Sequence, residues 1–345
     1  MKNRLIILMT AITIFGASSA FASVAKNIVM GNGDPVGLID RGSFYYDSNN
    51  NIFYNPSYAN EYKNWATVEV SRFGIVGTTA EGGFVNAFGS WILGFYMNRS
   101  GATRGSYTNA VSHRPFDLII ASDMGTKWGL GITFGGYKTG STTSEKDLTL
   151  RAGAQFGELE PYISVKVIGS DKTLAGETKT TGYGGGVKYK WGEWTPYLAY
   201  NKLSSPTGNI NYGWGMGIGR NTKVGEAHLT YAIALWEDLG PKRWIIPVDM
   251  ALEGSLTAWL KARAGFTYNL IDITKEVTTG ADTTSARVGA TINVSKVDFD
   301  WVIGHTGSNA TSVGAVPTTG TDVTTGKSFD LASGFFTAAS LTYHW

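Results

Sequence analysis

The chain of 345 residues carries 29 lysines and arginines against 27 acidic residues, together with 45 glycines and no cysteine. This near balance of charge excludes a typical nucleic-acid-binding protein, which would carry a basic excess, and the lack of cysteine excludes disulfides as a source of stability. Mean hydropathy lies near zero, which fits a chain that alternates apolar and polar residues, in a membrane barrel or in a large soluble β-sandwich or solenoid.

Residues 1–22 form a predicted secretory signal peptide. Lys2 and Arg4 precede an apolar run from Leu5 to Phe15, and Ala20-Phe21-Ala22 supplies a small-x-small cleavage site. We therefore expect cleavage after Ala22 and a single mature domain over residues 23–345. Because no cysteine follows the cleavage site, a lipid-anchored lipoprotein is excluded, and no later apolar run is long enough for a membrane helix.

Segments with alternating residues start at Ala66 and continue to the end of the chain. One parity in each segment is apolar, which is the period-two pattern of a β-strand; the even-numbered residues of Trp128–Phe134 and the odd-numbered residues of Val85–Phe95 are examples. The segments have about the length of a tilted strand that crosses a bilayer, roughly 9–11 residues. Trp191 and Trp194 lie at the ends of alternating segments, where an interfacial aromatic girdle requires them. The core of a soluble protein could also hold them.

The connections between these segments alternate between short and long. The predicted short turns are Thr78–Gly82, Asp123–Thr126, Gly157–Glu160, Gly192-Glu193, Arg220–Val224, Glu253–Ser255 and Ser295-Lys296. The predicted long loops are Asn98–Arg114, Lys138–Lys146, Gly169–Thr181, Ser204–Asn211, Asn269–Asp282 and Thr306–Asp330, with the briefer Glu237–Lys242 in the same series. This asymmetry is typical of outer-membrane barrels, which place short turns on the periplasmic side and longer loops outside.

The number of strands follows from closure. A lipid-exposed sheet edge would leave backbone groups unpaired in hydrocarbon, and bacterial barrels close with an even number of strands. Fifteen segments lie between Ala66 and Trp345, and the first of them, Ala66–Gly77, is expected to descend into a short turn. We therefore expect Gly37–Tyr46 to be the first of about sixteen strands, with Asp47–Trp65 as the first external loop. The alternative is fourteen strands with an N-terminal plug.

The last eleven residues, Phe335–Trp345, form an alternating strand that ends on an aromatic residue. This end resembles the outer-membrane β-barrel proteins of Gram-negative bacteria, in which a terminal aromatic closes the last strand and serves as an assembly signal. The resemblance implies a transmembrane antiparallel β-barrel, surrounded by outer-membrane lipid and inserted by the barrel-assembly machinery. It assigns the assembly signal to Leu341, Tyr343 and Trp345. We expect Leu341 and Tyr343 to face lipid, His344 to face inward, and the strand to pair with Gly37–Tyr46.

Charged residues on the predicted inner face fall into separate groups. The basic residues are Lys127, Arg151, Lys166, Lys188, Lys190, Lys261, Arg263 and Arg287, and the acidic residues are Glu69, Asp117, Asp123, Glu226, Asp249, Glu253, Asp298 and Asp300. In a water-filled lumen, such patches create a field across the channel that orients solutes and tunes ion selectivity. The alternative is a set of salt bridges that only keep the wall wet.

Glycine occupies alternate positions on one predicted inner face. Gly213, Gly215, Gly217 and Gly219 leave bare backbone there. Glycine weakens a strand, so a row of it indicates close approach by another segment. We expect an inward-folded loop or the N-terminal segment to lie against this face and to narrow the pore.

The sequence thus predicts a porin that passes small hydrophilic solutes and ions by passive diffusion, without a reaction, a cofactor or a bound metal. General porins of this size are similar and form homotrimers, so the resemblance implies a trimer. One alternative is a transporter for hydrophobic substrates, because Asn55-Pro56-Ser57 resembles the Asn-Pro-Ala segment of outer-membrane fatty-acid and hydrocarbon transporters. The other is a structural or hydrolytic barrel, in which His228 beside Glu226 and Thr230 would carry the chemistry.

Overall fold

The computed structural model describes residues 23–31, 38–39, 41–73, 76–99, 115–139, 143–173, 176–205, 208–240, 242–274, 282–309 and 335–345. Three short helices come first: α2 (Val24–Met30), η1 (Asn49–Phe53) and η2 (Pro56–Asn60). The strands are β1 (Trp65–Phe73), β2 (Val76–Phe88), β3 (Trp91–Met97), β4 (Phe116–Asp123), β5 (Lys127–Thr139), β6 (Thr143–Gln155), β7 (Leu159–Thr173), β8 (Gly176–Lys179), β9 (Thr181–Tyr189), β10 (Trp194–Ser205), β11 (Gly208–Val224), β12 (Ala227–Asp238), β13 (Arg243–Ser255), β14 (Leu260–Thr274), β15 (Asp282–Val294), β16 (Val297–Asn309) and β17 (Phe335–His344). No helix in these ranges is long and apolar enough to cross a membrane.

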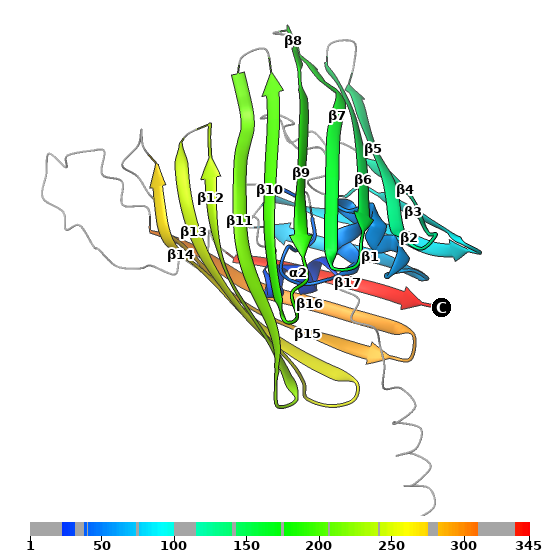
Figure 1. Cartoon of the computed structure of the whole chain (residues 1–345), viewed down its shortest axis with the longest axis vertical. Helices are drawn as coiled ribbons and strands as arrows, with labels where there is room; N and C mark the ends of the chain where they lie inside the picture. The colour runs from blue at the N-terminus through cyan, green and yellow to red at the C-terminus, as the bar shows by residue number, and fades with distance from the viewer. Residues whose placement is uncertain are drawn as a thin grey trace, which may run out of the picture.

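The sheet closes on itself because its first and last strands pair (Figure 1). β1 and β17 are antiparallel, with Trp65 opposite His344 and Phe73 opposite Phe336. β8 and β9 are interrupted only at Thr180 and pair with the same neighbour, β7, so together they count as one barrel strand. The structure therefore confirms a closed antiparallel barrel of sixteen strands, which leaves no sheet edge to be satisfied in hydrocarbon.

The first strand begins at Trp65, so the prediction of a strand at Gly37–Tyr46 is wrong. The described part of that segment forms bends, and residues 47–64 contain η1 and η2 rather than an external loop. β17 pairs with β1 instead. The structure combines sixteen strands with an N-terminal segment inside the barrel, so the alternative of fourteen strands with a plug is wrong in its strand count only.

The strand that the sequence count missed lies within the Val85–Phe95 row. Gly89 and Ser90 form a turn between β2 and β3, and Gly89 has a φ of 64°, a left-handed conformation that glycine adopts without a steric penalty. The outward-facing residues are even-numbered before this turn and odd-numbered after it. The apolar alternation in the sequence therefore runs through the turn without a break, and it does not reveal the turn. Thr78–Gly82, predicted as a turn, belongs to β2.

Short turns lie together at the end of the barrel that carries Trp345. In the described ranges they are residues 89–90, 124–126, 157–158, 192–193, 225–226, 256–259 and 295–296, and Trp345 donates from Nε1 to Asn86 Oδ1 at 2.8 Å close to the first of them. At the opposite end, strand pairing extends into the predicted loops Lys138–Lys146, Gly169–Thr181 and Ser204–Asn211. The described parts of these polar segments satisfy their backbone groups by pairing, so there they continue the strands rather than form open loops.

The outer surface is apolar and the wall facing inward is polar. Leu130, Ile132 and Phe134 point outward and are 41–48% exposed, whereas Thr133 between them is fully buried. On β17, Leu341 and Tyr343 face outward, as predicted, and Thr342 faces inward. Apolar residues outside and polar residues inside are what a barrel surrounded by lipid requires.

The described residues among 23–64, namely 23–31, 38–39 and 41–64, lie inside the barrel, and we call them the plug (Figure 1). α2 packs against β13–β17, and η2 packs against β3–β6. Apolar plug residues such as Phe44 and Ile52 join wall residues such as Tyr197 and Trp236 in one buried cluster. The core of this barrel is therefore the contact between its own N-terminal segment and its inner wall.

Candidate functional site

The plug folds through short-range hydrogen bonds. Ser23 caps α2 by accepting from the Lys26 N–H at 3.1 Å. The Asn51 side chain accepts from the Ser43 N–H at 2.9 Å and donates to the Tyr46 carbonyl at 3.2 Å, which fixes the turn before η1. At the start of α2, a polar side chain thus replaces a backbone partner that the first turn of a helix lacks.

Asn55-Pro56-Ser57 starts the second of the two 3-10 helices. Asn55 Oδ1 accepts from the Ser57 N–H at 3.2 Å, and Pro56 occupies the first helical position, where no N–H is needed. Gly129 and Gly153 on the wall lie so close to Pro56 and Asn55 that a β-carbon on either glycine would collide with them. The motif therefore sits in a glycine-lined recess of β5 and β6.

The glycine face of β11 also receives the plug. A β-carbon on Gly215 would lie 2.8 Å from Leu38 Cδ1, and a β-carbon on Gly219 would lie 2.7 Å from the ring of Tyr45. The predicted approach of the N-terminal segment to this face is confirmed. The absence of side chains at these positions makes room for the plug.

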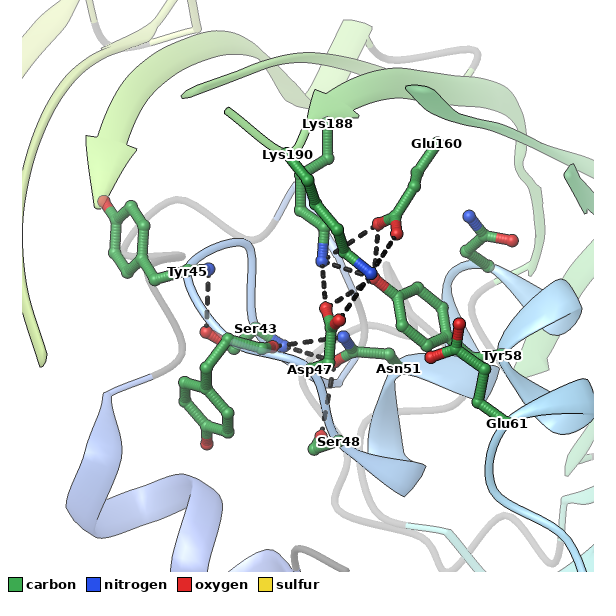
Figure 2. A network of polar contacts seen from close by, with 12 residues as sticks. Ser43, Tyr45, Asp47, Ser48, Asn51, Tyr58, Glu61, Glu160, Lys188 and Lys190 are labelled. Carbon is green, nitrogen blue, oxygen red and sulfur yellow. Dashed lines mark hydrogen bonds and ion pairs between the residues drawn. The ribbon is translucent and has the colours of Figure 1, made fainter. Parts of the chain in front are cut away.

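Lys188 of β9 and Lys190, which directly follows β9, meet two carboxylates and a tyrosine at one surface of the plug (Figure 2). Asp47 binds Lys188 at 2.7 Å and Lys190 at 2.6 Å. Glu160 of β7 binds the same two ammonium groups at 3.1 and 2.7 Å. The Tyr58 hydroxyl contacts Asp47, Glu160 and Lys188. We call these five residues the β9 cluster.

Asp47 is held in its charged form. Burial acts to raise the pKa of its carboxyl, but the nearby ammonium groups of Lys188 and Lys190 outweigh burial and keep that pKa well below its ordinary value. Burial raises the pKa of Tyr58, and the neighbouring Tyr54, Asp47 and Glu160 add to this effect, so its hydroxyl keeps its proton. The plug therefore presents one anion and one neutral hydroxyl to the two lysines.

Arg41 connects the plug to the strands that close the barrel. Its guanidinium lies 2.7 Å from Glu81 Oε1 and 3.6 Å from Glu69 Oε2. Glu69 also accepts from the Val24 N–H at 2.7 Å, at the start of α2. Glu69 was predicted to line the pore, and it does lie on the inner wall, where it holds the plug.

Lys26 of α2 makes a third connection, to the wall at β13. Its ammonium group lies 3.2 Å from Glu253 of β13. Glu253 also binds Arg263 of β14, which reaches Asp300 of β16 at 3.1 Å. One plug lysine thus joins a chain of charges that crosses four wall strands.

Asp117 of β4 is the centre of a fully buried group. Arg99 Nε lies 2.9 Å from it and Arg151 Nη2 lies 2.5 Å from it. Arg151 also donates to the Phe53 carbonyl of the plug at 2.5 Å. Arg99 lies just beyond β3, so the start of that connection also folds inward.

The other residues predicted to line the pore are less closely tied to the plug. Lys166 pairs with Asp147, Arg287 lies 3.9 Å from Asp249, and Asp298 lies 3.0 Å from His344. Lys127 reaches Glu61 of the plug at 2.9 Å near the short-turn end, and Lys261 is half-buried. Asp123 is exposed because it is the last residue of β4, at the short-turn rim. Glu226 is exposed in the β11–β12 turn, because β11 continues through the predicted turn Arg220–Val224. Neither residue is therefore part of the buried inner wall.

Sequence patterns missed the charged residues of the plug itself. Lys26, Asp47 and Glu61 lie outside the predicted strands, and Arg41 lies in Gly37–Tyr46, which was wrongly predicted to be a strand. Two of their wall partners, Glu81 and Glu160, lie in predicted turns. The glycine face was the only sequence signal for the plug. His228 is exposed near a turn, and no group of three or more His, Cys, Asp or Glu residues within the described ranges could hold a metal ion.

No family model matches this chain, and no curated protein matches it. Among solved structures, CdiB from Acinetobacter baumannii is 10% identical, with a TM-score of 0.49 over 82% of this chain, and this chain spans 60% of its length. A porin is 12% identical, with a TM-score of 0.43 over 81% of this chain and its own full length. The CymD monoaromatic hydrocarbon channel is 11% identical, with a TM-score of 0.39 over 84% of this chain and 91% of its own. The barrel assignment rests on the strand pairing of this chain, independently of these similarities.

Proposed function

We propose that this protein is an outer-membrane transport barrel that passes small hydrophilic solutes and ions when its N-terminal plug moves. The observation that supports this most directly is how the plug is held: charged side chains bind it to a charged inner wall, at Asp47, Arg41 and Lys26. Moving the plug would expose a wall of charged and hydroxyl groups. A sixteen-stranded barrel is wide enough for an aqueous channel.

The plug changes the passive porin expected from the sequence into a gated one. Charged groups released from the plug can be solvated by water in the lumen, whereas an apolar contact would lose its stabilisation on release. The ion pairs therefore oppose release of the plug less than apolar contacts of equal area would. Release must also separate the buried apolar cluster in which Phe44 and Ile52 contact the wall. We infer that solutes cross only during release.

A transporter for hydrophobic substrates is the second candidate. The Asn55-Pro56-Ser57 segment, which resembles a segment of fatty-acid and hydrocarbon transporters, lies in the plug against glycines of β5 and β6. The charged groups around the plug favour hydrophilic solutes instead, because a greasy conduit would leave them desolvated.

We also propose that the barrel is inserted by the assembly machinery of the outer membrane and forms a homotrimer there. The resemblance to general porins is the basis of the trimer. The mass of the particle in detergent tests it, and a mass of one chain would contradict it.

A disulfide between plug and wall tests whether the plug must move. The chain has no cysteine, and a β-carbon on Gly219 would lie 2.9 Å from Tyr45 Cβ, so a small shift reaches the separation of about 3.8 Å that a disulfide needs. In planar bilayers, we expect the oxidised Tyr45→Cys, Gly219→Cys variant to lose the stepwise conductance of the wild type. Reductant should restore the conductance.

The two single-cysteine variants are the matched controls, and oxidation should leave their conductance unchanged. Full conductance of the oxidised double variant would contradict gating by the plug. Saturable fatty-acid binding by a wild-type protein that never conducts would favour the second candidate.

A further inference from the structure

Four lysines gather on the outer surface where β5, β6, β7 and β8 end, away from the short turns. Lys138, Lys146, Lys172 and Lys179 come from these four strands in that order, and all four are exposed. We call these four residues the lysine patch. The upper ends of the four strands lie near one another in Figure 1.

The pairing register places the lysines in two adjacent rows. Ser144 of β6 is opposite both Lys138 and Lys172, and Ser170 of β7 is opposite both Lys146 and Lys179. Since strands lie about 4.8 Å apart and alternate residues along a strand about 7 Å apart, the four side chains start within one small area. They converge on one region of the barrel surface.

The surface between these lysines is hollowed, and two carboxylates, Glu145 and Glu177, line the hollows together with the four lysines. Two open hollows, of about 500 and 610 Å³, share Ser144, Lys146 and Lys172 in their linings. Glu177 lies beside the patch and accepts from the Ser170 hydroxyl at 2.8 Å. No ion pair joins any of the four lysines to a carboxylate in the parts of the chain that the structure describes.

Apolar residues continue the same strands directly below the lysine patch. The next row across β5, β6 and β7 is Phe134, Leu148 and Ile168, of which Phe134 and Ile168 are 42% and 45% exposed on the outer surface. Lysine side chains above an apolar band place their ammonium groups at the level of lipid headgroups. This end lies opposite the short turns, so it faces the outer leaflet in the orientation of outer-membrane barrels.

We propose that the lysine patch binds the phosphate groups of an outer-leaflet glycolipid, whose acyl chains lie along Phe134, Leu148 and Ile168. The four ammonium groups suit a headgroup with two phosphates, and the apolar row suits the chains attached to that headgroup. Free phosphate would use the lysines but not the apolar row. The proposal relies on the outer-membrane orientation proposed above and does not depend on movement of the plug.

Native mass spectrometry of the purified full barrel with lipid A that carries two phosphates tests this site. Lys146→Gln, Lys172→Gln removes the two lysines shared by both hollows. Lys223→Gln, Lys296→Gln removes two exposed lysines at the short-turn end and is the matched control. We expect the patch variant to bind the lipid at least about tenfold more weakly, and the control to bind as the wild type does.

The wild type should also discriminate among probes. Binding should weaken with added salt, and neither dephosphorylated lipid A nor inorganic phosphate alone should bind with comparable affinity. Equal binding by the patch and control variants, or equal binding of dephosphorylated lipid A by the wild type, would overturn the proposal. Inorganic phosphate that bound as tightly as the lipid would reduce the site to an anion site and also overturn it. Heat-modifiable gel migration verifies that each variant is folded.

Discussion

Asp47 shows how single residues hold the plug. It binds Lys188, which is 1% exposed, and Lys190, which is 33% exposed. Because the pKa of Asp47 in the folded protein lies below its unfolded value near 3.9, this attachment stabilises the docked plug at any pH above that value. It is lost only as the pH falls through the folded pKa. We therefore expect this contact not to alter gating between pH 5 and 8.

Replacing Asp47 with asparagine should loosen the plug. Loss of a charged partner of the buried Lys188 should weaken docking by about 2 kcal/mol, which corresponds to roughly a thirtyfold rise in the ratio of open to closed channel. Single-channel recording measures this ratio. Glu61→Gln is the control, because its pair with Lys127 is more exposed, at 26% and 36%, and is worth about 1 kcal/mol or less. Equal effects of the two changes would contradict the role of the β9 cluster.

At the scale of the element, β17 closes the barrel and Trp345 follows it. β17 pairs with β16 on one side and β1 on the other, whereas Trp345 contributes a contact with Asn86 and a stacked ring contact with Tyr343 at 6.0 Å. Deleting Trp345 leaves the strand ladder intact but removes the proposed assembly signal. We expect less assembled barrel in cells and an unchanged unit conductance of what assembles.

Semi-native gels of outer membranes and bilayer recording measure these two quantities. Trp259→Ala is the matched control, because Trp259 is also an exposed tryptophan at the short-turn end, at 53% exposure, but lies in a turn. Normal assembly without Trp345, or an equal defect in the control, would remove the case for an assembly signal.

For the whole molecule, the barrel and the plug are separable in sequence. All sixteen barrel strands follow residue 64, so deletion of residues 24–63 removes the plug without removing a strand. We expect the remaining barrel to insert and to conduct steadily, with an ohmic response and a salt-dependent ion preference set by the uncovered wall charges. Conductance equal to that of the full chain would show that the plug does not restrict flow. Wall pairs such as Arg263 with Glu253 persist without the plug, which keeps the inner face satisfied.

Local alternation was enough to predict most of the barrel. In Trp128–Phe134 and Phe335–Trp345, the outward and inward faces are those predicted. Alternate residues of a strand face lipid and the lumen, so each environment selects every second residue. The same signal failed at Gly89-Ser90, where apolar alternation passes through a two-residue turn. It also misplaced Asp123 and Glu226, because strand ends depend on how far pairing with a neighbour continues.

The sequence by itself determined a closed barrel with an apolar exterior and an even number of strands, because each strand meets lipid with its own residues and closure admits only an even count. Its count of about sixteen agrees with the structure only because the false strand at Gly37–Tyr46 offsets the missed division between β2 and β3. The content of the lumen was decided only by the tertiary structure. Asp47 meets Lys188 and Arg151 meets Phe53 across about a hundred or more positions of the chain, and no periodicity specifies such partners. At the glycine face of β11, the sequence predicted the close approach of another segment. The structure identifies Leu38 and Tyr45 as the residues that approach it.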